Sequence, residues 1–264
     1  MKCPICLNEV FYETVVLKQR LIDEWELSFT EVDYINKQQG LCCTNCHCSL
    51  RSMTLANCIM ENFSFYGPFN QFYGSKFGSQ LKLLEINSAG GLHPIFILFK
   101  NYVFAEYPKV DLQNLPYSDN SFDLVVHSDT LEHVDDSLLA LKECLRVLKN
   151  GGVLFYTIPI IYSRMTRRRD TLPNSYHGRQ DEMQGDDYKV FTEYGADFWI
   201  EIIKAGFTEI SIHTLGEPST IAIRAKKANN IKYKPKSLNP LLIIKKAFKS
   251  RIKLILKNKY EFYR

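Results

Sequence analysis

Short apolar runs alternate with amphipathic stretches over residues 78–225 of this 264-residue chain. The apolar runs are rich in β-branched and aromatic residues and have turn residues at their edges, a pattern that predicts strands. The predicted strands are LKLLEI (81–86), NYVFAEY (101–107), FDLVVHSD (122–129), GVLFYTIPI (152–160), FTEISIHTL (207–215) and TIAIRAKK (220–227).

Two stretches between these strands have apolar residues at helical spacing. SLLALKECLRVLKN (137–150) predicts a helix that ends at the glycine pair Gly151-Gly152, and GADFWIEIIKAG (195–206) predicts a helix closed by its last glycine. Strands that alternate with helices predict an α/β fold with a Rossmann-like, doubly wound parallel sheet. The short turn between the last two strands predicts that the last strand is antiparallel.

Six of the eight cysteines lie in the first 50 residues. Cys3-Pro-Ile-Cys6 and Cys43-Thr-Asn-Cys46 are two C-x-x-C pairs separated by 36 residues. Two such pairs supply the four-thiolate shell that structural zinc prefers, which predicts a zinc-ribbon-like module over residues 1–60. Unliganded thiols are the alternative. Cys42, His47 and Cys48 crowd the second pair, so the choice of ligands there stays open.

The first strand of the sheet runs into the turn LKLLEINSAGG (81–91). In a doubly wound fold this turn faces the ligand, and glycines let the backbone approach a cofactor closely. Asn87, Ala89, Gly90 and Gly91 occupy the glycine-bearing part of the turn. Taken alone, the stretch is more typical of a strand that enters an ordinary turn and helix.

An ordered series of motifs follows this turn. It consists of Asp111-Leu112 leading into LPY (115–117), then DNSFDLVV (119–126), LEHV (131–134) and RVLKNGG (146–152). This series resembles the class I S-adenosylmethionine-dependent methyltransferases of the methyltransferase type 11 group. The resemblance covers about residues 80–225, and it implies a methyltransferase domain over residues 61–227.

The resemblance implies a cofactor site for S-adenosylmethionine. Glu85 would orient the methionine end beside the Ala89-Gly90-Gly91 turn, and Glu106 would accept from the ribose. Asp111 would accept from the adenine amino group, and Leu112 would pack on its ring. His127 and Ser128 would line the reaction centre.

The sequence departs from the methyltransferase pattern in two places. The first turn lacks the family's G-x-G-x-G. Only four residues separate Glu106 from Asp111, so a helix usually found there is absent or vestigial. A fold that no longer binds cofactor is therefore an alternative.

The segment after the predicted strand GVLFYTIPI (152–160) contains the candidate acceptor site. Arg167, Arg168, Arg169 and Tyr176 are candidate acceptor-binding residues, because arginine forks suit phosphate or carboxylate. His177 or His133 could act as the base, although structural hydrogen bonding is an alternative for both. Together with SYHG (175–178) and VFTEYGADF (190–198), the arginine run is similar to a subgroup of methyltransferases found with bacterial glycan-assembly enzymes. That similarity implies O-methylation of a glycan, or of its nucleotide- or lipid-linked precursor.

The charge of the chain is unevenly distributed. From Arg224 onward there are 14 lysines and arginines against one acid, whereas the remaining chain carries 19 against 28 acids. Residues 228–264 predict a basic amphipathic tail for an anionic membrane surface. A helix packed on the body or on a partner is an alternative, and nucleic acid is a less favoured one.

Several properties of the whole protein follow from these observations as expectations. No apolar run is long enough to span a bilayer and no signal peptide is recognisable, which indicates a cytoplasmic protein, peripheral at the inner membrane face if the tail binds lipid. Two alternatives to a glycan methyltransferase stay open. One is an RNA methyltransferase that grips RNA with the zinc module and tail, and the other is a non-catalytic binding module.

Overall fold

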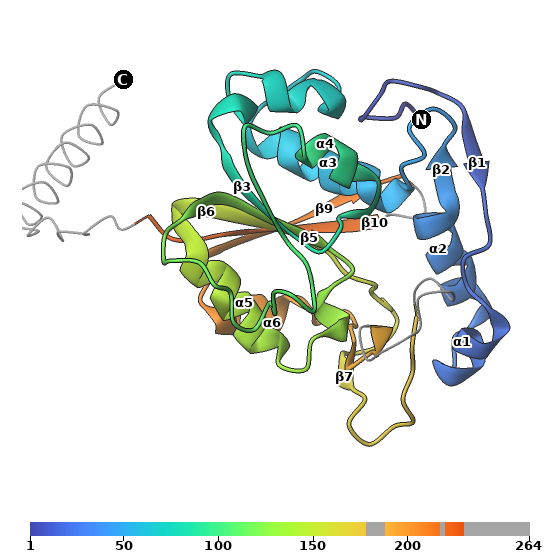
Figure 1. Ribbon diagram of the computed structural model, residues 1–264. Helices are drawn as coiled ribbons and strands as arrows, with labels where there is room; N and C mark the ends of the chain where they lie inside the picture. The colour runs from blue at the N-terminus through green and yellow to red at the C-terminus, as the bar shows by residue number, and fades with distance from the viewer. Residues whose placement is uncertain (178–187, 217–219, 230–264) are drawn as a thin grey trace, which may run out of the picture. The chain divides into compact units, whose positions relative to one another are not determined.

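The computed structural model describes residues 1–177, 188–216 and 220–229, which contain one six-stranded sheet (Figure 1). Four of its strands pair in parallel, and the last strand of the described chain is antiparallel to both of its neighbours, as predicted. In spatial order the strands are β4 (Asn101–Ala105), β3 (Lys82–Ile86), β5 (Phe122–Ser128), β6 (Leu148–Thr157), β10 (Thr220–Lys226) and β9 (Glu209–Leu215). The predicted α/β Rossmann-like fold is confirmed.

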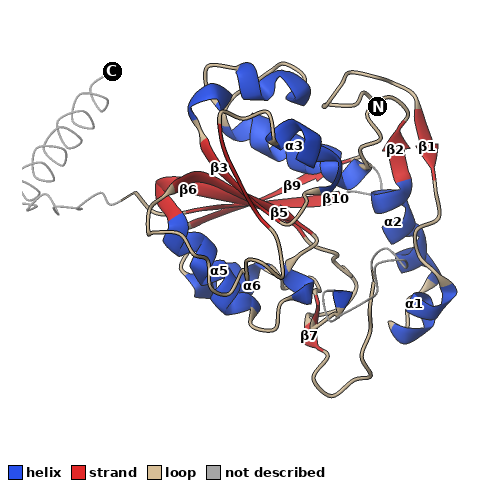
Figure 2. Cartoon of the chain, viewed as in Figure 1, coloured by secondary structure: helices blue, strands red, loops and turns tan. Residues whose placement is uncertain are grey.

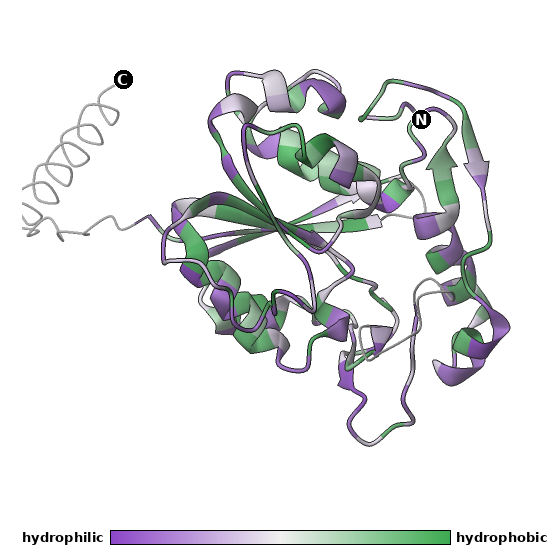
Figure 3. Ribbon diagram, viewed as in Figure 1, coloured by the Kyte–Doolittle hydropathy of each residue, from purple (hydrophilic) through white to green (hydrophobic). Residues whose placement is uncertain are grey.

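Helices cover both faces of this sheet (Figures 1 and 2). On one face α3 (Leu50–Asn62) packs on β10, β6 and β9. On the other face α5 (Ser137–Val147) packs on β6 and on α6 (Trp199–Ala205). The central strands between these layers are hydrophobic (Figure 3), and burial of their side chains supplies most of the driving force for folding.

Capping and glycine geometry set the ends of the two predicted helices. α5 begins where the Asp136 side chain accepts a hydrogen bond from the Leu139 N–H, and α6 ends at Gly206 in the left-handed conformation, as predicted. The prediction that the first helix ends at Gly151-Gly152 is wrong. α5 ends at Val147, because Leu148 already belongs to β6 and pairs with Phe122 of β5. Residues 149–152 form a bulge within β6, in which Gly151 has a φ of 76°.

The cysteine-rich segment forms a small antiparallel ribbon that packs on the sheet. β1 (Phe11–Glu13) pairs with β2 (Leu41–Cys43), and α1 (Gln19–Glu24) and α2 (Phe29–Gly40) lie between them in the sequence. Residues 1–229 form one compact unit, and the predicted module boundary at residue 60 falls within α3. Cys3, Cys43 and Cys48 share a buried core with side chains of α3 and the sheet.

Short elements complete the described chain. They are the 3-10 helices η1 (Phe69–Gly74), η2 (Gly78–Gln80), η3 (Gly90–Leu92) and η4 (Leu131–His133), helix α4 (His93–Phe96), and the paired strands β7 (Arg167–Arg168) and β8 (Thr192–Glu193). Within residues 1–177, 188–216 and 220–229, no helix is long and apolar enough to cross a membrane. The predicted basic tail lies almost wholly outside the described residues.

The loop between β4 and β5 contains no helix or strand, as its length predicts, and α5 holds it in place. The Arg146 guanidinium donates to the carbonyls of Leu115 and Tyr117, and the Glu143 carboxylate accepts from the Leu115 N–H. These hydrogen bonds fix the carboxyl-terminal half of the loop against the sheet and thereby position Asp111 beside the ends of the strands.

The turn after β3 packs directly on the cysteine segment. Cys48 Sγ lies 3.2 Å from the carbonyl oxygen of Gly91, and a Cβ added at Gly91 would lie 2.6 Å from that sulfur. The glycine at this position is therefore required by the approach of Cys48. This contact joins the N-terminal segment to the edge of the sheet at which doubly wound folds bind ligands.

Replacing Gly91 with alanine is expected to lower the free energy of unfolding by about 1–3 kcal/mol, because a packed interior relieves such an overlap only by shifting. Gly74→Ala is the matched control, since nothing lies within 4 Å of its added Cβ. Urea unfolding measures both variants. Equal stabilities of Gly91→Ala and the parent would show that Cys48 does not pack on this turn.

Candidate functional site

A cavity of about 260 Å³ lies at the carboxyl ends of β3 and β5, where the order of the strands reverses. We call it the strand-end cavity. Its apolar lining consists of Ile86, Val110, Leu112, Val134 and Phe191. Its polar lining includes Asn87, Asp111, Gln113, Thr130 and His133. Apolar faces with a few convergent polar groups are typical of small-molecule sites.

Asn87 forms the left-handed turn that the sequence assigned to the first loop. Its φ is 51°, its N–H donates to the Ala105 carbonyl at 2.8 Å, and its Oδ1 accepts from the Tyr107 N–H at 3.0 Å. Asparagine tolerates this conformation better than most residues. Asn87 therefore ties the end of β3 to the loop after β4 and shapes one wall of the cavity.

Glu85 is completely buried and holds the same turn from inside. Its carboxylate accepts hydrogen bonds from the Ala89 N–H at 2.8 Å, from His93 Nδ1 at 2.8 Å and from the Tyr102 hydroxyl at 2.6 Å. Burial, reinforced by Glu85, raises the pKa of the Tyr102 phenol, so that group remains a donor. Glu85 thus orders the loop and is not among the residues that line the cavity.

The three predicted acids do not converge on one cavity. Asp111 lines the strand-end cavity, and its Oδ1 also accepts from the Gln113 N–H at 2.8 Å. Glu106 is exposed at the end of β4 and is not part of the cavity lining, and Glu85 faces the interior of the turn. Of the three predicted acids, only Asp111 is therefore placed to accept directly from a ligand in the cavity.

The other predicted cofactor residues are divided in the same way. Leu112 lines the cavity together with Asn87. The lining does not include the turn residues Ala89, Gly90 and Gly91, nor His127 and Ser128 of β5.

His127 is buried in the core instead of standing at the mouth of its strand. Its ring stacks on Tyr156 with ring centroids 4.8 Å apart, and neither ring nitrogen has a hydrogen-bond partner among the described residues. Burial lowers the pKa of His127 to about 3, so the imidazole is neutral. The neighbouring Ser128 hydroxyl is hydrogen-bonded to Thr157 at 2.7 Å.

His133 and His177, the two candidate bases, lie together although 43 residues separate them in the sequence. Their ring centroids are 4.6 Å apart, and His133 lines the strand-end cavity. Burial lowers the pKa of both rings, which are therefore neutral at pH 7. His177 also packs edge-on against Trp25, a contact between the loop after β6 and the N-terminal segment that no sequence motif indicates.

The arginine run is engaged in ion pairs within the protein. Arg167 and Arg169 both bind the buried Glu193 carboxylate, and Arg168 binds Asp135 and Asp170 at 2.8 Å. These pairs join the loop after β6 to β8 and to the loop after η4. The backbone of Tyr176, the remaining candidate, forms an isolated antiparallel β-bridge with Lys189. Acceptor binding by these four residues stays a prediction.

Arg51 is a second residue that sequence reasoning missed. It lies on α3 with 4% of its surface exposed and forms an ion pair with Asp129, directly after β5. Arg51 gave no signal in the sequence because it belongs to no motif. Its position brings the N-terminal segment into contact with the ligand edge of the sheet.

The four predicted metal ligands converge. The sulfur atoms of Cys3, Cys6, Cys43 and Cys46 all lie within 4.8 Å of one another. Cys3 and Cys46 are 3.6 Å apart, as are Cys6 and Cys43. Although burial opposes ionisation of Cys43, the N–H groups of Cys46 and Asn45 and the amide of Asn8 hold the pKa of this thiol at about 6.

The crowding cysteines near the second pair have other contacts. Cys42 Sγ lies 3.7 Å from the Gln39 carbonyl, and Cys48 contacts Gly91. His47 packs edge-on against Tyr12. These contacts leave the four sulfurs as the candidate metal-ligand set at this end of the molecule.

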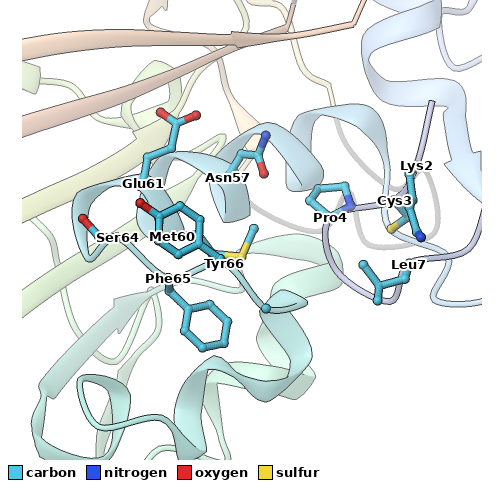
Figure 4. A pocket seen from close by; sticks show the side chains of 11 residues that line it. Lys2, Cys3, Pro4, Leu7, Asn57, Met60, Glu61, Ser64, Phe65 and Tyr66 are labelled. Carbon is cyan, nitrogen blue, oxygen red and sulfur yellow. The ribbon is translucent and has the colours of Figure 1, made fainter.

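A larger cavity of about 520 Å³ lies between the first cysteine loop and the end of α3 (Figure 4). Its lining includes Lys2, Asn57, Glu61 and the exposed Tyr66. None of the predicted cofactor or acceptor residues lines it, and its charged groups are few. The strand-end cavity is therefore the stronger candidate for chemistry.

The sequence matches known methyltransferases over its central part. Residues 97–156 match the family described as Methyltransferase domain. A protein of Mycolicibacterium smegmatis, described as a probable S-adenosylmethionine-dependent methyltransferase, is 38% identical over 86 residues, or 30% of this chain and 32% of that protein. A Mycobacterium tuberculosis protein of the same description is 31% identical over 118 residues, or 42% and 38%.

A shorter match links residues of this chain to the demethylmenaquinone methyltransferase of Staphylococcus haemolyticus, with 54% identity over 44 residues, or 17% of this chain and 18% of that protein. Among solved structures, a SAM-dependent methyltransferase of Thermotoga maritima aligns with 79% of this chain and 97% of that chain, at a TM-score of 0.40 and 18% identity. The matched segments span less than two fifths of these curated relatives.

Replacing His127 with phenylalanine is expected to make the free energy of unfolding fall less steeply as the pH is lowered. Because the folded-state pKa is lowered, the stability due to neutral His127 is complete above pH ~6.5 and is lost as the pH falls toward 3. Between pH 7.5 and 5 the parent should lose roughly 2 kcal/mol that His127→Phe retains.

Urea unfolding of the two proteins at pH 7.5, 6 and 5 measures this difference directly. Phenylalanine keeps the stacking on Tyr156 and removes the two ring nitrogens. A stability difference between the two proteins that does not change with pH would contradict a buried, neutral His127.

Proposed function

We propose that this chain, which carries a class I methyltransferase domain, is an S-adenosylmethionine-dependent methyltransferase whose cofactor nucleoside occupies the strand-end cavity. The observation that carries this proposal is the position of the cavity at the strand-order reversal. Most of the residues that line the cavity also lie within residues 97–156, the segment that matches the methyltransferase family. The lining suits a purine, because apolar side chains can cover both ring faces and Asp111 can accept from an exocyclic amine.

The cofactor, when bound, supplies an electrophilic methyl group on a sulfonium. The residues of the chain have the remaining tasks: they align the acceptor, exclude water and remove a proton. Asn87 and Glu85 keep the first turn in place, and Asp111 and Leu112 fix the nucleoside. His133, which lines the cavity, and His177, whose ring packs against it, have neutral imidazoles that could take the proton leaving the acceptor.

We further propose that the acceptor is a hydroxyl of a glycan, or of a nucleotide- or lipid-linked glycan precursor. Neutral imidazoles can draw a proton from a hydroxyl, either directly or through a bound cation. The glycan class itself rests on the resemblance of the motifs over residues 167–198 to methyltransferases found with glycan-assembly enzymes. An anionic membrane surface for the basic tail remains part of this proposal.

Isothermal calorimetry with S-adenosylmethionine is expected to show one site per chain, and Asp111→Ala should weaken binding about 10- to 100-fold because a charged acceptor is lost. Asp33→Ala is the control, since that carboxylate pairs with Lys37 on the exposed side of α2. Undetectable binding to the folded parent would contradict the proposed function. Equal affinities of Asp111→Ala and the parent would contradict the placement of the nucleoside.

We also propose that Cys3, Cys6, Cys43 and Cys46 bind a structural zinc ion. Four bonds of about 2.3 Å in tetrahedral geometry separate the sulfurs by about 3.8 Å, close to the 3.6 Å found for two of the pairs. Four protein ligands leave no position for substrate, so the ion would stabilise the fold. The core shared by these cysteines and α3 would then transmit that stability to the sheet.

Cys43→Ser is expected to reduce the zinc bound at this site to well below one per chain and to lower the melting temperature. Cys42→Ser, the neighbouring substitution, should leave both unchanged, because that sulfur contacts the Gln39 carbonyl. Atomic absorption after exhaustive dialysis measures the metal. Retention of the metal by Cys43→Ser, or its loss from Cys42→Ser, would contradict the four-cysteine site.

A further inference from the structure

Three metal-binding side chains converge beside the strand-end cavity. Glu132 and His133 belong to η4, and His177 comes from the loop after β6. Their ligand atoms all lie within 4.8 Å of one another. Glu132 Oε1 is 3.7 Å from His133 Nε2 and 3.8 Å from His177 Nε2. These distances are too long for direct hydrogen bonds.

Glu132 places its carboxyl group in the interior of the protein. Only 1% of its surface is exposed, and neither of its oxygens has a hydrogen-bond partner among the described residues. Burial of an unpaired charge is among the most costly arrangements in a protein, and such groups are normally paired or bind a metal. The site therefore needs a cation or a proton beside this carboxylate.

His133 is oriented so that its lone pair faces Glu132. Its Nδ1 lies 3.0 Å from the carbonyl oxygen of Lys189, which can only accept, so Nδ1 carries the hydrogen. Nε2 of the neutral ring is then an acceptor. A backbone carbonyl that fixes the outer nitrogen in this way is the usual support for a metal-binding histidine.

His177 adds a third ligand atom with no partner. Its Nε2 is buried and has no hydrogen bond to any described residue. A proton placed on Glu132 would find no acceptor within hydrogen-bonding distance in the described part of the chain, since both imidazole nitrogens are more than 3.5 Å away. The nearby cation Arg51 is already paired with Asp129. A bound ion between the three groups satisfies all of them at once.

We propose that Glu132, His133 and His177 bind a divalent transition metal such as zinc, cobalt, iron or manganese. Two imidazoles and one carboxylate are a ligand set that such ions accept, with bonds of about 2.0–2.2 Å. Tetrahedral bonds of this length separate ligand atoms by roughly 3.4 Å, so the Glu132 oxygen needs to approach each imidazole nitrogen by only a few tenths of an ångström. Three protein ligands leave coordination positions open, and His133 lines the strand-end cavity.

The role of this ion rests on the proposed function, whereas its position does not. A hydroxyl of the acceptor bound at an open position would lose its proton more readily, because the ion stabilises the alkoxide. The oxygen then forms a bond to the methyl carbon as the bond from sulfur to that carbon breaks. The sulfur keeps the electron pair of that bond, and the hydroxyl proton passes to water.

Titration of the zinc-loaded chain with Co²⁺ tests the site. The expected result is one Co²⁺ per chain beyond the four-cysteine zinc, with weak visible bands and no intense thiolate-to-cobalt charge-transfer band. Glu132→Gln, which keeps the shape of the side chain, should weaken this binding at least about 100-fold, and His177→Gln should do the same. Asp33→Asn is the control carboxylate, on the exposed side of α2.

A parent protein that takes up no Co²⁺ beyond the zinc would overturn the proposal, as would Glu132→Gln and His177→Gln variants that bind Co²⁺ as tightly as the parent. Circular dichroism of each variant excludes loss of fold as the cause. Calorimetry with S-adenosylmethionine on the same samples keeps the two proposals apart. Cofactor binding without Co²⁺ binding removes only the metal site, and Co²⁺ binding without cofactor binding removes only the methyltransferase.

Discussion

The buried carboxylate of Glu85 is the constraint on which the ligand edge of the sheet depends. It accepts hydrogen bonds from the turn after β3, from α4 and from β4, so three separate elements meet on one charge. Without this carboxylate the buried Ala89 N–H and the partly buried His93 ring and Tyr102 hydroxyl would each lose a partner, which is more costly than the loss of one hydrogen bond. A turn with few glycines is held in shape by this means.

The N-terminal cysteine segment also supports the ligand edge of the sheet. Cys48 fills the space left by Gly91, and Arg51 pairs with Asp129 at the end of β5. Trp25 supports His177 from the other side. The segment therefore contacts the first turn, the end of β5 and one candidate base, so a metal that folds it would also order the strand-end cavity.

The strands could be predicted because each is a β-branched, aromatic run bounded by turn residues, but α3 could not. Ten of its thirteen residues are buried, so the helix is covered on nearly every side. Its sequence therefore lacks the alternation of apolar and polar faces by which a surface helix is recognised. His127 was misplaced for a related reason. His127 lies two residues after Val125 on β5, so both side chains face the core, and the motif alone does not reveal which face a side chain takes. The approach of His177 to Glu132 depends on packing between distant segments, which local sequence does not encode.

The central claim is that ligand binding occurs at the carboxyl ends of β3 and β5 and engages the turn that Glu85 holds. Hydrogen exchange read by mass spectrometry, with and without S-adenosylhomocysteine, tests it most directly. The account predicts that protection increases in peptides covering residues 84–92, 106–115 and 129–135. Protection confined to residues 57–67, around the larger cavity, or no change in any peptide, would contradict it.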